Sequence, residues 1–564
     1  MKYLLTIFLC VQAFAGTARH VVASGGVASG NALDSATGWT LTYAASTTTI
    51  QPGDTVYLHT GTYPSHVDFT RSGTASQPII YRNYNNQYVA LDGGTDNYNH
   101  AVVVISANYV WLWGLRITSS ATTKDNGNNG GGSYSWPTNI LQPEGIMTNN
   151  SAGSGLSHDC KLIHCVVDNN RQGLSSWIES KNIEVYGCVF FSNGWRDDQG
   201  TYRGHNWYIQ TKEMEGTKKF IANVNSLAYG EGFQAYGSQC MDSLYFDKNT
   251  FIDNLWSRNF IISIGDVHAS TDDFIRDNQS YQGSATNMFY VTHPVGYVWD
   301  STARFTFTNN RMWSTGTFTW NWVQRTTMTV SGNCIRYGSF NADDPSTYGT
   351  NNTWTSSNPT GWDTVVVIPS TYESKRALVT VWNTAGANTA SIPCTFLTSG
   401  DAYEVRDVQN YYGALIASGT YSGSPISVSL TSTAIPAKIG DDPRTIAHTD
   451  KRFNCFVVSS TTAGAAPEQT SAPTVTSPIY TGATSVSGTS ESGASVDVYV
   501  NLASVGTTNA SGTSWTKTVS ALSLGNTVKA KATASGKTES EFSNTVTVSA
   551  SPATSTKYLI VRHK

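Results

Sequence analysis

The chain has 564 residues, of which 13% are charged, 39% hydrophobic and 12% aromatic, with 49 glycines and a net charge of −4. This length predicts several domains, and the composition is typical of a β-rich exported protein with many polar turns. The net negative charge argues against nucleic acid and anionic membrane surfaces as partners.

The first fifteen residues have the features of a signal peptide. Lys2 supplies a positive charge, the apolar run LLTIFLCVQAFA follows, and Ala13-Phe14-Ala15 forms a small-residue cleavage site. A buried first strand is the alternative. We expect residues 1–15 to be removed near Ala15 and the mature protein to be secreted or displayed at the cell surface. No later apolar run reaches the roughly 18 residues of a membrane span.

The next segments, in chain order, are predicted to be short strands. In each run of about five residues, apolar and polar side chains alternate, and Gly, Asn or Asp separates one run from the next. This pattern favours strands over helices. The runs are GDTVYL (53–58), QPIIYR (77–82), YVWLWGLRI (109–117), EGIMTNN (144–150), KLIHCVV (161–167) and GLSSWIES (173–180). Insertions at 119–140 and 194–206 interrupt them. The first is so rich in Gly that it cannot pack a core.

The middle of the chain repeats itself. The strand GFQAY (232–236) returns as NFIIS (259–263) and as NMFYV (287–291), at offsets of 27 and 28 residues. A turn asparagine keeps step with the strands. These asparagines are Asn223, Asn249, Asn278, Asn310 and Asn333. Self-similarity at this period predicts a solenoid, whose units bury their apolar faces only against one another.

Coils of three short strands, stacked about 4.8 Å apart, form a parallel β-helix. Stacked asparagine amides can hydrogen bond along the column, and Asn tolerates the left-handed backbone that such a bend needs. The strands GHNWYIQ (204–210) and EGFQAYG (231–237) resemble the right-handed parallel β-helix proteins of the pectate-lyase-like superfamily. More narrowly, they are similar to a secreted bacterial subgroup with GHGIYxQ and YGIHAYG strands in adjacent coils. This resemblance implies that GDTVYL and GTY (61–63) open the β-helix.

Beyond residue 340 the period dissolves. The runs DTVVVIPS, ALVTVWN and DAYEVRDVQNYYG lie at sandwich spacing and resemble the β-sandwich module of the same subgroup. The run SVSGTSESGASVDVYVN resembles a bacterial Ig-like domain. The predicted fold is therefore all-β, a right-handed parallel β-helix followed by two sandwiches. Its predicted segments are the β-helix at 16–360, the β-sandwich at 361–460, a linker at 461–473, the Ig-like domain at 474–550 and a tail at 551–564.

Seven of the eight cysteines lie beyond the signal peptide, without CxxC or Cys/His metal spacing. Cys165 and Cys188 occupy equivalent positions in successive coils. We expect them to stack as small hydrophobic residues, a disulfide being the alternative.

Strand alternation predicts which side chains face outward. Large apolar residues must fill the narrow core, which assigns six residues inward: Trp207, Ile209, Phe233, Ala235, Phe260 and Ile262. Their neighbours form one outward ladder of Met147, Ser175, Tyr208, Gln234, Ile261 and Phe289, and a second of Asn149, Trp177, Gln210, Tyr236, Ser263 and Val291. At the centre, the side chains of Trp177, Tyr208, Gln210, Gln234 and Tyr236 form a patch of aromatic faces and amides, which suits sugar rings and hydroxyls. Aromatic strand formers covered by the long loops are the alternative interpretation.

Charged residues flank this patch and suit a polysaccharide lyase, which needs a base for the proton beside a uronate carboxylate and a cation for the enolate charge. Tyr208, His205 and Lys212 are candidate bases, and Arg203 and Lys212 are candidate cations. A Tyr or Lys base needs burial or a cationic neighbour, because their ordinary pKa values are about 10 and 10.4. The remaining candidate substrate-binding residues are Glu179, Asp266 and His268. Calcium would need clustered carboxylates, which are not evident, so no metal or cofactor is predicted.

Two other functions remain open. A glycoside hydrolase needs two carboxyls about 5–10 Å apart, and the pair Asp197-Asp198 lies too near His205 in sequence to match polygalacturonases. A non-catalytic, glycan-binding adhesin or spike-like protein would share the same modules. The sequence favours cleavage of an acidic polysaccharide by β-elimination, and leaves the sugar and the oligomeric state open.

Overall fold

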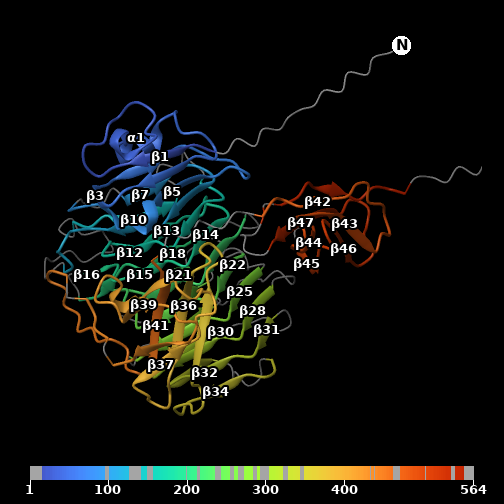
Figure 1. Cartoon of the computed structure of the whole chain (residues 1–564). Coiled ribbons are helices and arrows are strands. Elements are labelled where there is room, and N and C mark those ends of the chain that lie inside the picture. The colour runs from blue at the N-terminus through green and yellow to red at the C-terminus, as the bar shows by residue number, and fades with distance from the viewer. Residues whose placement is uncertain are drawn as a thin grey trace, which may run out of the picture. The chain divides into compact units, whose positions relative to one another are not determined.

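The computed structural model describes residues 16–551 except for short gaps. The gaps are 96–100, 126–140, 149–156, 198–199, 212–215, 236–242, 255–259, 264–271, 284–288, 293–303, 322–327, 343–348, 432, 437–438, 462–469, 502, 535–539 and 541. The predicted signal peptide therefore lies outside the described residues. The chain forms two compact units (Figure 1). The first runs from β1 (Ala18–Val21) to β41 (Phe453–Ser460), and the second from β42 (Thr474–Val475) to β48 (Val546–Thr547).

Three long parallel sheets, here called walls A, B and C, make up most of the first unit. Wall A contains β1, β2 (Thr55–Leu58), β5 (Ile79–Asn83), β8 (Val110–Trp113), β11 (Lys161–Ile163), β14 (Ile183–Tyr186), β19 (Lys218–Ile221), β22 (Leu244–Asp247), β25 (Asp272–Arg276), β28 (Arg304–Thr308) and β31 (Met328–Ser331). Wall B contains β3 (Gly61–Pro64), β6 (Val89–Asp92), β9 (Arg116–Thr118), β12 (Val166–Asp168), β15 (Val189–Phe191), β20 (Val224–Ser226), β23 (Thr250–Ile252), β26 (Gln279–Gln282), β29 (Arg311–Ser314), β32 (Cys334–Arg336) and β34 (Thr353–Thr355). Wall C contains β4 (Val67–Phe69), β7 (Ala101–Ile105), β10 (Glu144–Thr148), β13 (Leu174–Ser176), β18 (Trp207–Ile209), β21 (Phe233–Ala235), β24 (Phe260–Ser263), β27 (Phe289–Thr292), β30 (Thr317–Asn321) and β33 (Ser339–Ala342).

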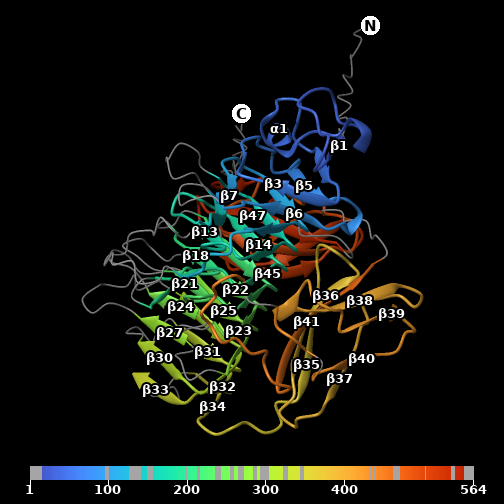
Figure 2. The same ribbon diagram turned by 90° about the vertical axis from the view of Figure 1, so that its left-hand side faces the viewer.

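The chain visits walls A, B and C in turn, for example through β19, β20 and β21, so each circuit is one coil of a parallel β-helix (Figure 2). All strand pairs within the three walls are parallel, as the stacking of coils requires. The predicted fold class, a parallel β-helix followed by antiparallel sandwiches, is confirmed.

The inside of the tube is apolar because alternate residues of each strand point inward. Trp207 of wall C lies edge-on to Phe190 of wall B, with ring centroids 5.6 Å apart, and 4.8 Å from the ring of Phe220 of wall A. The predicted inward residues Trp207, Ile209, Phe233 and Ala235 are fully buried. Each large side chain of this kind contributes about 1.5–3 kcal/mol by leaving water.

The predicted asparagine column is confirmed. Asn278 shows the pattern: its backbone N–H and its side-chain Nδ2 both donate to Oδ1 of Asn310, at 3.1 and 3.0 Å. Nδ2 also donates to the carbonyl of Phe246. The same bonds join Asn223, Asn249, Asn310 and Asn333 to the next member, and Asn352 continues the column.

The N-terminal end of the tube is closed by α1 (Leu41–Ser46). Thr40 caps this helix by accepting a hydrogen bond from the N–H of Tyr43, and Leu41, Ala44 and Ala45 pack into the same core as the walls. Two short 3₁₀ helices, η1 (Ser35–Thr37) and η2 (Tyr84–Asn86), lie in the loops of this region.

An antiparallel sandwich follows the last coil. Its larger sheet has the order β35 (Thr364–Pro369), β36 (Arg376–Trp382), β41, β38 (Ala402–Asp407) and β39 (Ala417–Thr420), and its smaller sheet pairs β37 (Thr389–Ile392) with β40 (Ile426–Ser429). The 3₁₀ helix η4 (Val408–Asn410) follows β38. The larger sheet lies beside wall B (Figure 2), and one of its faces shares an apolar cluster with that wall. The sandwich and the β-helix are therefore packed together in one unit.

The second unit contains two antiparallel sheets around its own core. One has the order β42, β43 (Ser485–Thr489) and β46 (Ser514–Thr518). The other has β45 (Ala503–Asn509), β44 (Ser495–Val500), β47 (Thr527–Thr533) and β48. Buried Trp515 is the largest residue of this core. The assignment of the second unit as an Ig-like domain stays a prediction.

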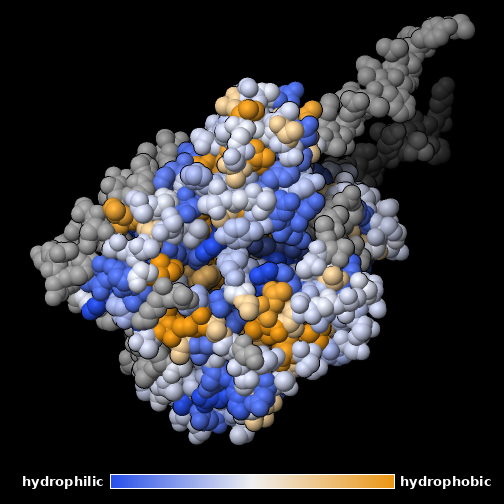
Figure 3. Space-filling view, turned by 60° about the vertical axis from the view of Figure 1, so that its left-hand side comes forward, coloured by the Kyte–Doolittle hydropathy of each residue, from blue (hydrophilic) through white to orange (hydrophobic). Residues whose placement is uncertain are grey.

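The predicted stacking of Cys165 and Cys188 is confirmed, because the Cys188 Sγ accepts the N–H of Cys165 at 3.2 Å and both thiols are free. No helix in the described part of the chain is both long and apolar enough to cross a bilayer. On the face shown in Figure 3, apolar side chains form separate patches between polar ones.

Candidate functional site

Four residues of the predicted patch, Trp177, Tyr208, Gln210 and Gln234, lie on or directly after the strands β13, β18 and β21 of wall C. Hydrogen-bonded register places Met147, Ser175, Tyr208 and Gln234 side by side, as the first ladder predicts. Tyr208 and Gln234 are half-buried, while their inward neighbours are fully buried. Neighbouring strands lie about 4.8 Å apart, so substituents of one sugar chain can reach several of these residues.

The ladders fail beyond β24. Ile261 pairs with Tyr290 and Ser263 with Thr292, so Phe289 and Val291 do not belong to the outward ladders. Phe289 and Val291 pair instead with Phe260 and Ile262, which are the residues of β24 that alternate with Ile261 and Ser263. The repeat in the sequence aligns Asn259 with Asn287. The strand register shows that the coil from β24 to β27 is one residue longer than this alignment allows. A shift of one residue exchanges the two faces of a strand.

A second polar column stands at the beginning of these strands, two positions before the buried apolar column. Its members are Glu144, Gln172, His205 and Glu231. Ser175 joins the first two: its hydroxyl donates to Glu144 Oε2 at 2.6 Å and accepts from Gln172 Nε2 at 2.5 Å. Burial raises the pKa of Glu144 above its ordinary value, although the Ser175 hydrogen bond and the charge of Arg171 oppose the shift.

His205, Tyr208 and Trp177 form an aromatic cluster. The imidazole of His205 stacks on the Tyr208 ring, with centroids 5.6 Å apart and planes inclined by 25°. Trp177 meets the same ring edge-on at 5.4 Å. Glu231 Oε2 lies 3.3 Å from His205 Nδ1, within ion-pair distance though not aligned for a hydrogen bond. Both of these side chains are mostly buried, 14% and 17% exposed.

The predicted cation Arg203 already has a partner. It lies on β17 (Tyr202–Arg203), which forms an antiparallel hairpin with β16 (Trp195–Arg196). Its Nε donates to Asp197 Oδ2 at 2.8 Å. The carboxylate balances the guanidinium charge, so Arg203 offers less to a bound anion than its sequence position suggests.

The structure thus brings the rings of Trp177 and His205 against Tyr208, places Gln210 directly after β18 and puts Gln234 on the neighbouring strand β21. Glu179 follows β13 by three residues and is half-buried. Four predicted site residues lie outside the described residues: Lys212, Tyr236, Asp266 and His268. Among the residues that are described, no group of three or more His, Cys, Asp or Glu side chains could hold a metal ion.

Sequence reasoning missed Glu231 and Lys218. Glu231 in GEGFQ aligns with His205 in GHNWY, which places the two side chains in neighbouring coils. Lys218 aligns with Ile183 and Leu244, which are core residues, so a lysine at this inward position was the available signal. Its Nζ donates to three main-chain carbonyls, those of Ser176, Trp177 and Gln210.

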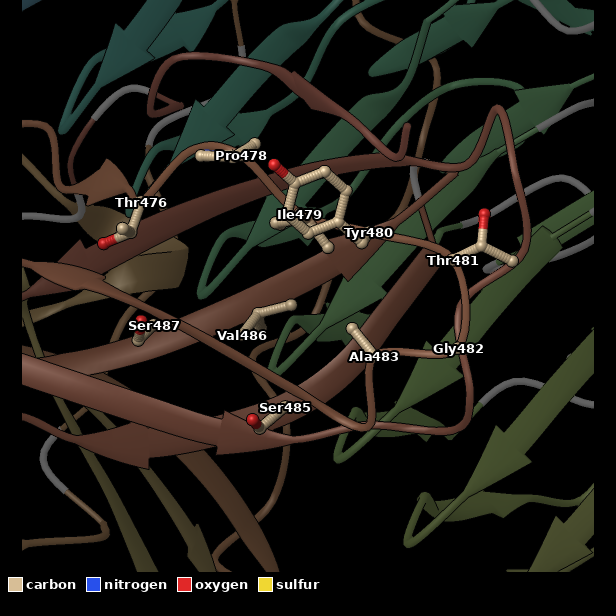
Figure 4. Close-up of a pocket in the computed structure, with 10 residues that line it drawn as sticks. All are labelled: Thr476, Pro478, Ile479, Tyr480, Thr481, Gly482, Ala483, Ser485, Val486 and Ser487. Carbon is tan, nitrogen blue, oxygen red and sulfur yellow. The ribbon is translucent and has the colours of Figure 1, made fainter. Parts of the chain in front are cut away.

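A separate hollow of about 420 Å³ lies in the second unit, beside β43 (Figure 4). Tyr480, Pro478 and Ile479 line it together with Ser and Thr hydroxyls. None of its lining residues carries a carboxyl, imidazole or amine, so it offers contacts to a ligand but no strong acid or base.

No family model and no curated protein matches this chain. Among solved structures, a biofilm-associated protein BSP domain is 22% identical over 34% of this chain, with a TM-score of 0.14, and the chain spans only 30% of that protein. An alginate lyase from Paenibacillus sp. str. FPU-7 is 13% identical, over 60% of this chain and 99% of that one, with a TM-score of 0.29. A DFA-IIIase from Arthrobacter chlorophenolicus A6 is 12% identical, over 60% and 94%, with a TM-score of 0.22. Likenesses this distant say nothing about the chemistry of the site.

Proposed function

We propose that this protein binds an acidic polysaccharide on the outer face of wall C and cleaves it by β-elimination. The observation that carries the proposal is the cluster of Trp177, Tyr208 and His205, backed by Glu231 and flanked by two glutamine amides. It combines a surface for sugar rings with a group that can accept a proton.

The binding part of the site suits a glycan. Trp177 and Tyr208 are half-buried and present apolar ring surface, which packs against the C–H faces of sugars. The amides of Gln210 and Gln234 can donate to a carboxylate or a hydroxyl and accept from a hydroxyl.

The catalytic part suits proton transfer. The Glu231 carboxylate favours the tautomer of His205 that carries its proton on Nδ1, and this leaves Nε2 as the acceptor. His205 removes the proton beside the uronate carboxylate, and the electron pair forms the new double bond as the glycosidic C–O bond breaks. The Tyr208 hydroxyl protonates the departing oxygen, and solvent returns the enzyme to its starting protonation state.

The hydrolase alternative fits less well. The carboxylates of the second polar column, Glu144 and Glu231, stand three coils apart, which separates their backbones by about 14 Å. Inverting hydrolases hold their two carboxyls at most about 9.5 Å apart. Glu144 is also held by Ser175, which keeps it away from Glu231.

Turnover of a panel of uronate polysaccharides tests the proposal. The full-length protein should generate an unsaturated product, seen as rising ultraviolet absorbance. Tyr208→Phe and His205→Gln should each lower kcat by about 10²-fold or more, because each removes a proton-transfer group. Tyr245→Phe is the control, since Tyr245 lies on wall A and stacks on Phe274. Glycan binding without turnover on any substrate would favour the adhesin.

A further inference from the structure

Lys218 places a charged group inside the tube directly behind this site. It begins β19 of wall A, and its side chain occupies the inward column between Ile183 and Leu244. It is 1% exposed. A lysine between two buried apolar residues is costly to bury unless its ammonium is fully hydrogen-bonded.

Three carbonyl oxygens satisfy that ammonium. Nζ donates to Ser176 O at 3.1 Å, to Trp177 O at 2.7 Å and to Gln210 O at 2.6 Å. The Ser176 carbonyl is the last of β13, and those of Trp177 and Gln210 directly follow β13 and β18, the strands that carry Ser175 and Tyr208. The single nitrogen therefore ties together the backbones of Trp177 and Gln210, two residues of the sugar-binding face.

Three acceptors around one nitrogen favour the charged form of Lys218. An ammonium has three N–H donors, whereas a neutral amine has two and carries a lone pair that would face a carbonyl oxygen. Burial lowers the pKa of Lys218 well below its ordinary value, and the charge of Glu179 opposes that shift. Within the described part of the chain, no carboxylate lies within salt-bridge distance of Lys218.

We propose that Lys218 is a positioning residue which, by holding a positive charge against the inner side of wall C, makes the site select an anionic glycan over a neutral one. This inference rests on the proposed function of the same site. A charge surrounded by apolar core acts at longer range than one in water. Its field therefore reaches the outer face over Trp177 and Gln210, where a uronate carboxylate gains from it and an uncharged sugar does not. Arg203 supplies no comparable field, because Asp197 balances it.

The test compares binding of two oligosaccharides that differ only in charge, an acidic uronate oligomer and the same oligomer with its carboxyls reduced to alcohols. Lys218→Met keeps the side-chain length and removes the charge. We expect the variant to bind the acidic oligomer about tenfold more weakly, with little change for the reduced one. Lys218→Arg keeps a charge and should retain the preference for the acidic oligomer. Lys161→Met is the control, because Lys161 lies on the outer face of wall A beside Glu184.

Two outcomes would overturn the inference. Equal weakening for both oligomers would assign Lys218 a structural role alone, and unchanged affinities would remove any role in the site. Lys218→Gln, which retains N–H donors without a charge, replaces the Met variant if that one does not fold. Failure of the proposed reaction is seen separately, since a wild-type protein that binds but never cleaves the acidic oligomer still reports the Lys218 preference.

Discussion

Polar side chains buried in the first unit bind main-chain carbonyls of neighbouring strands and turns. Asn278 donates to the carbonyl of Phe246, and Lys124 Nζ donates to those of Ser192 and Gly194. An unpaired buried carbonyl costs about 1–3 kcal/mol, so each such residue stabilises a bend of the coil. At the residue scale, the buried polar groups hold the turns that set the position of the site.

His448 predicts a measurable pH dependence of stability. Its Nε2 lies 2.7 Å from Asp407 Oδ2 and its Nδ1 lies 2.7 Å from Thr449 O, so both ring nitrogens face acceptors. Burial disfavours the imidazolium, but the hydrogen bond and charge of Asp407 outweigh it, with help from Thr449 O and the Asp253 charge, and the pKa of His448 rises. The native state then binds the extra proton, so this contribution is complete below the unfolded pKa of about 6.5 and is lost as pH rises through the folded pKa.

We expect His448→Gln to lower the free energy of unfolding by roughly 1.5–3 kcal/mol near pH 6, the value of a hydrogen bond to a charged group. The difference from wild type should shrink on going to about pH 9. Denaturant titrations at several pH values measure it. A difference that stays constant over this range would contradict the assignment.

The sandwich covers the outer face of wall B, which is apolar. Phe191, Ile252, Tyr281 and Trp313 of wall B share one cluster with residues of the larger sandwich sheet. Tyr281 stacks at 4.7 Å on Trp313 and at 5.1 Å on Phe453. At the element scale, wall B is a packing face, whereas the proposed site lies on wall C.

The connection between β40 and β41 adds contacts between the sandwich and the β-helix close to the proposed site. Arg444 lies 3.4 Å from the centre of the Tyr229 ring and donates to the carbonyl of Leu227. Tyr229 is two residues before Glu231, the neighbour of His205. The sandwich therefore supports the backbone that carries part of the proposed site.

Trp382 tests the interface between the sandwich and wall B. It is 3% exposed, packs on Trp362 and Phe453, and donates from Nε1 to Gln279 Oε1 at 2.7 Å. We expect Trp382→Ala to destabilise the first unit by about 3–5 kcal/mol, because it opens a cavity and orphans Gln279. Denaturant unfolding measures the loss, with exposed Leu415→Ala as the control. An equal loss in both variants would argue against a packed interface.

The whole molecule has separate cores in its two compact units. The β-helix and its sandwich share an apolar cluster, so they should unfold together, whereas the second unit depends on Trp515 and its neighbours. Each core is buried by its own strands, which is the condition for independent cooperative unfolding.

Calorimetry of the full chain should resolve two main transitions. Trp515→Ala should lower only one of them, by an amount that reflects about 3–5 kcal/mol. Trp382→Ala serves as the converse control and should lower only the other. A third transition assignable to residues 364–460 would show that the sandwich unfolds independently of the β-helix.

Much of the fold follows from the sequence because its signals are periodic and local. The inward position of Trp207 and Phe233 follows from strand alternation, and the asparagine column follows from one residue type recurring at each turn. The ladder through Ser175, Tyr208 and Gln234 was predictable for the same reason. The error at Phe289 arose because paired residues of β24 and β27 are 29 positions apart (289 − 260), one more than the repeat offset of 28.

The sequence by itself determined that this chain stacks short strands into coils, and which side of the central strands faces out. Only the tertiary structure decided that Glu231 stands beside His205 and that the Lys218 ammonium binds the carbonyl of Trp177. The physical reason is that alternation and turn chemistry act between near neighbours in the chain. The pairing of charges depends on loop lengths and on which coils come to lie next to one another, and those are settled only when the whole tube has formed.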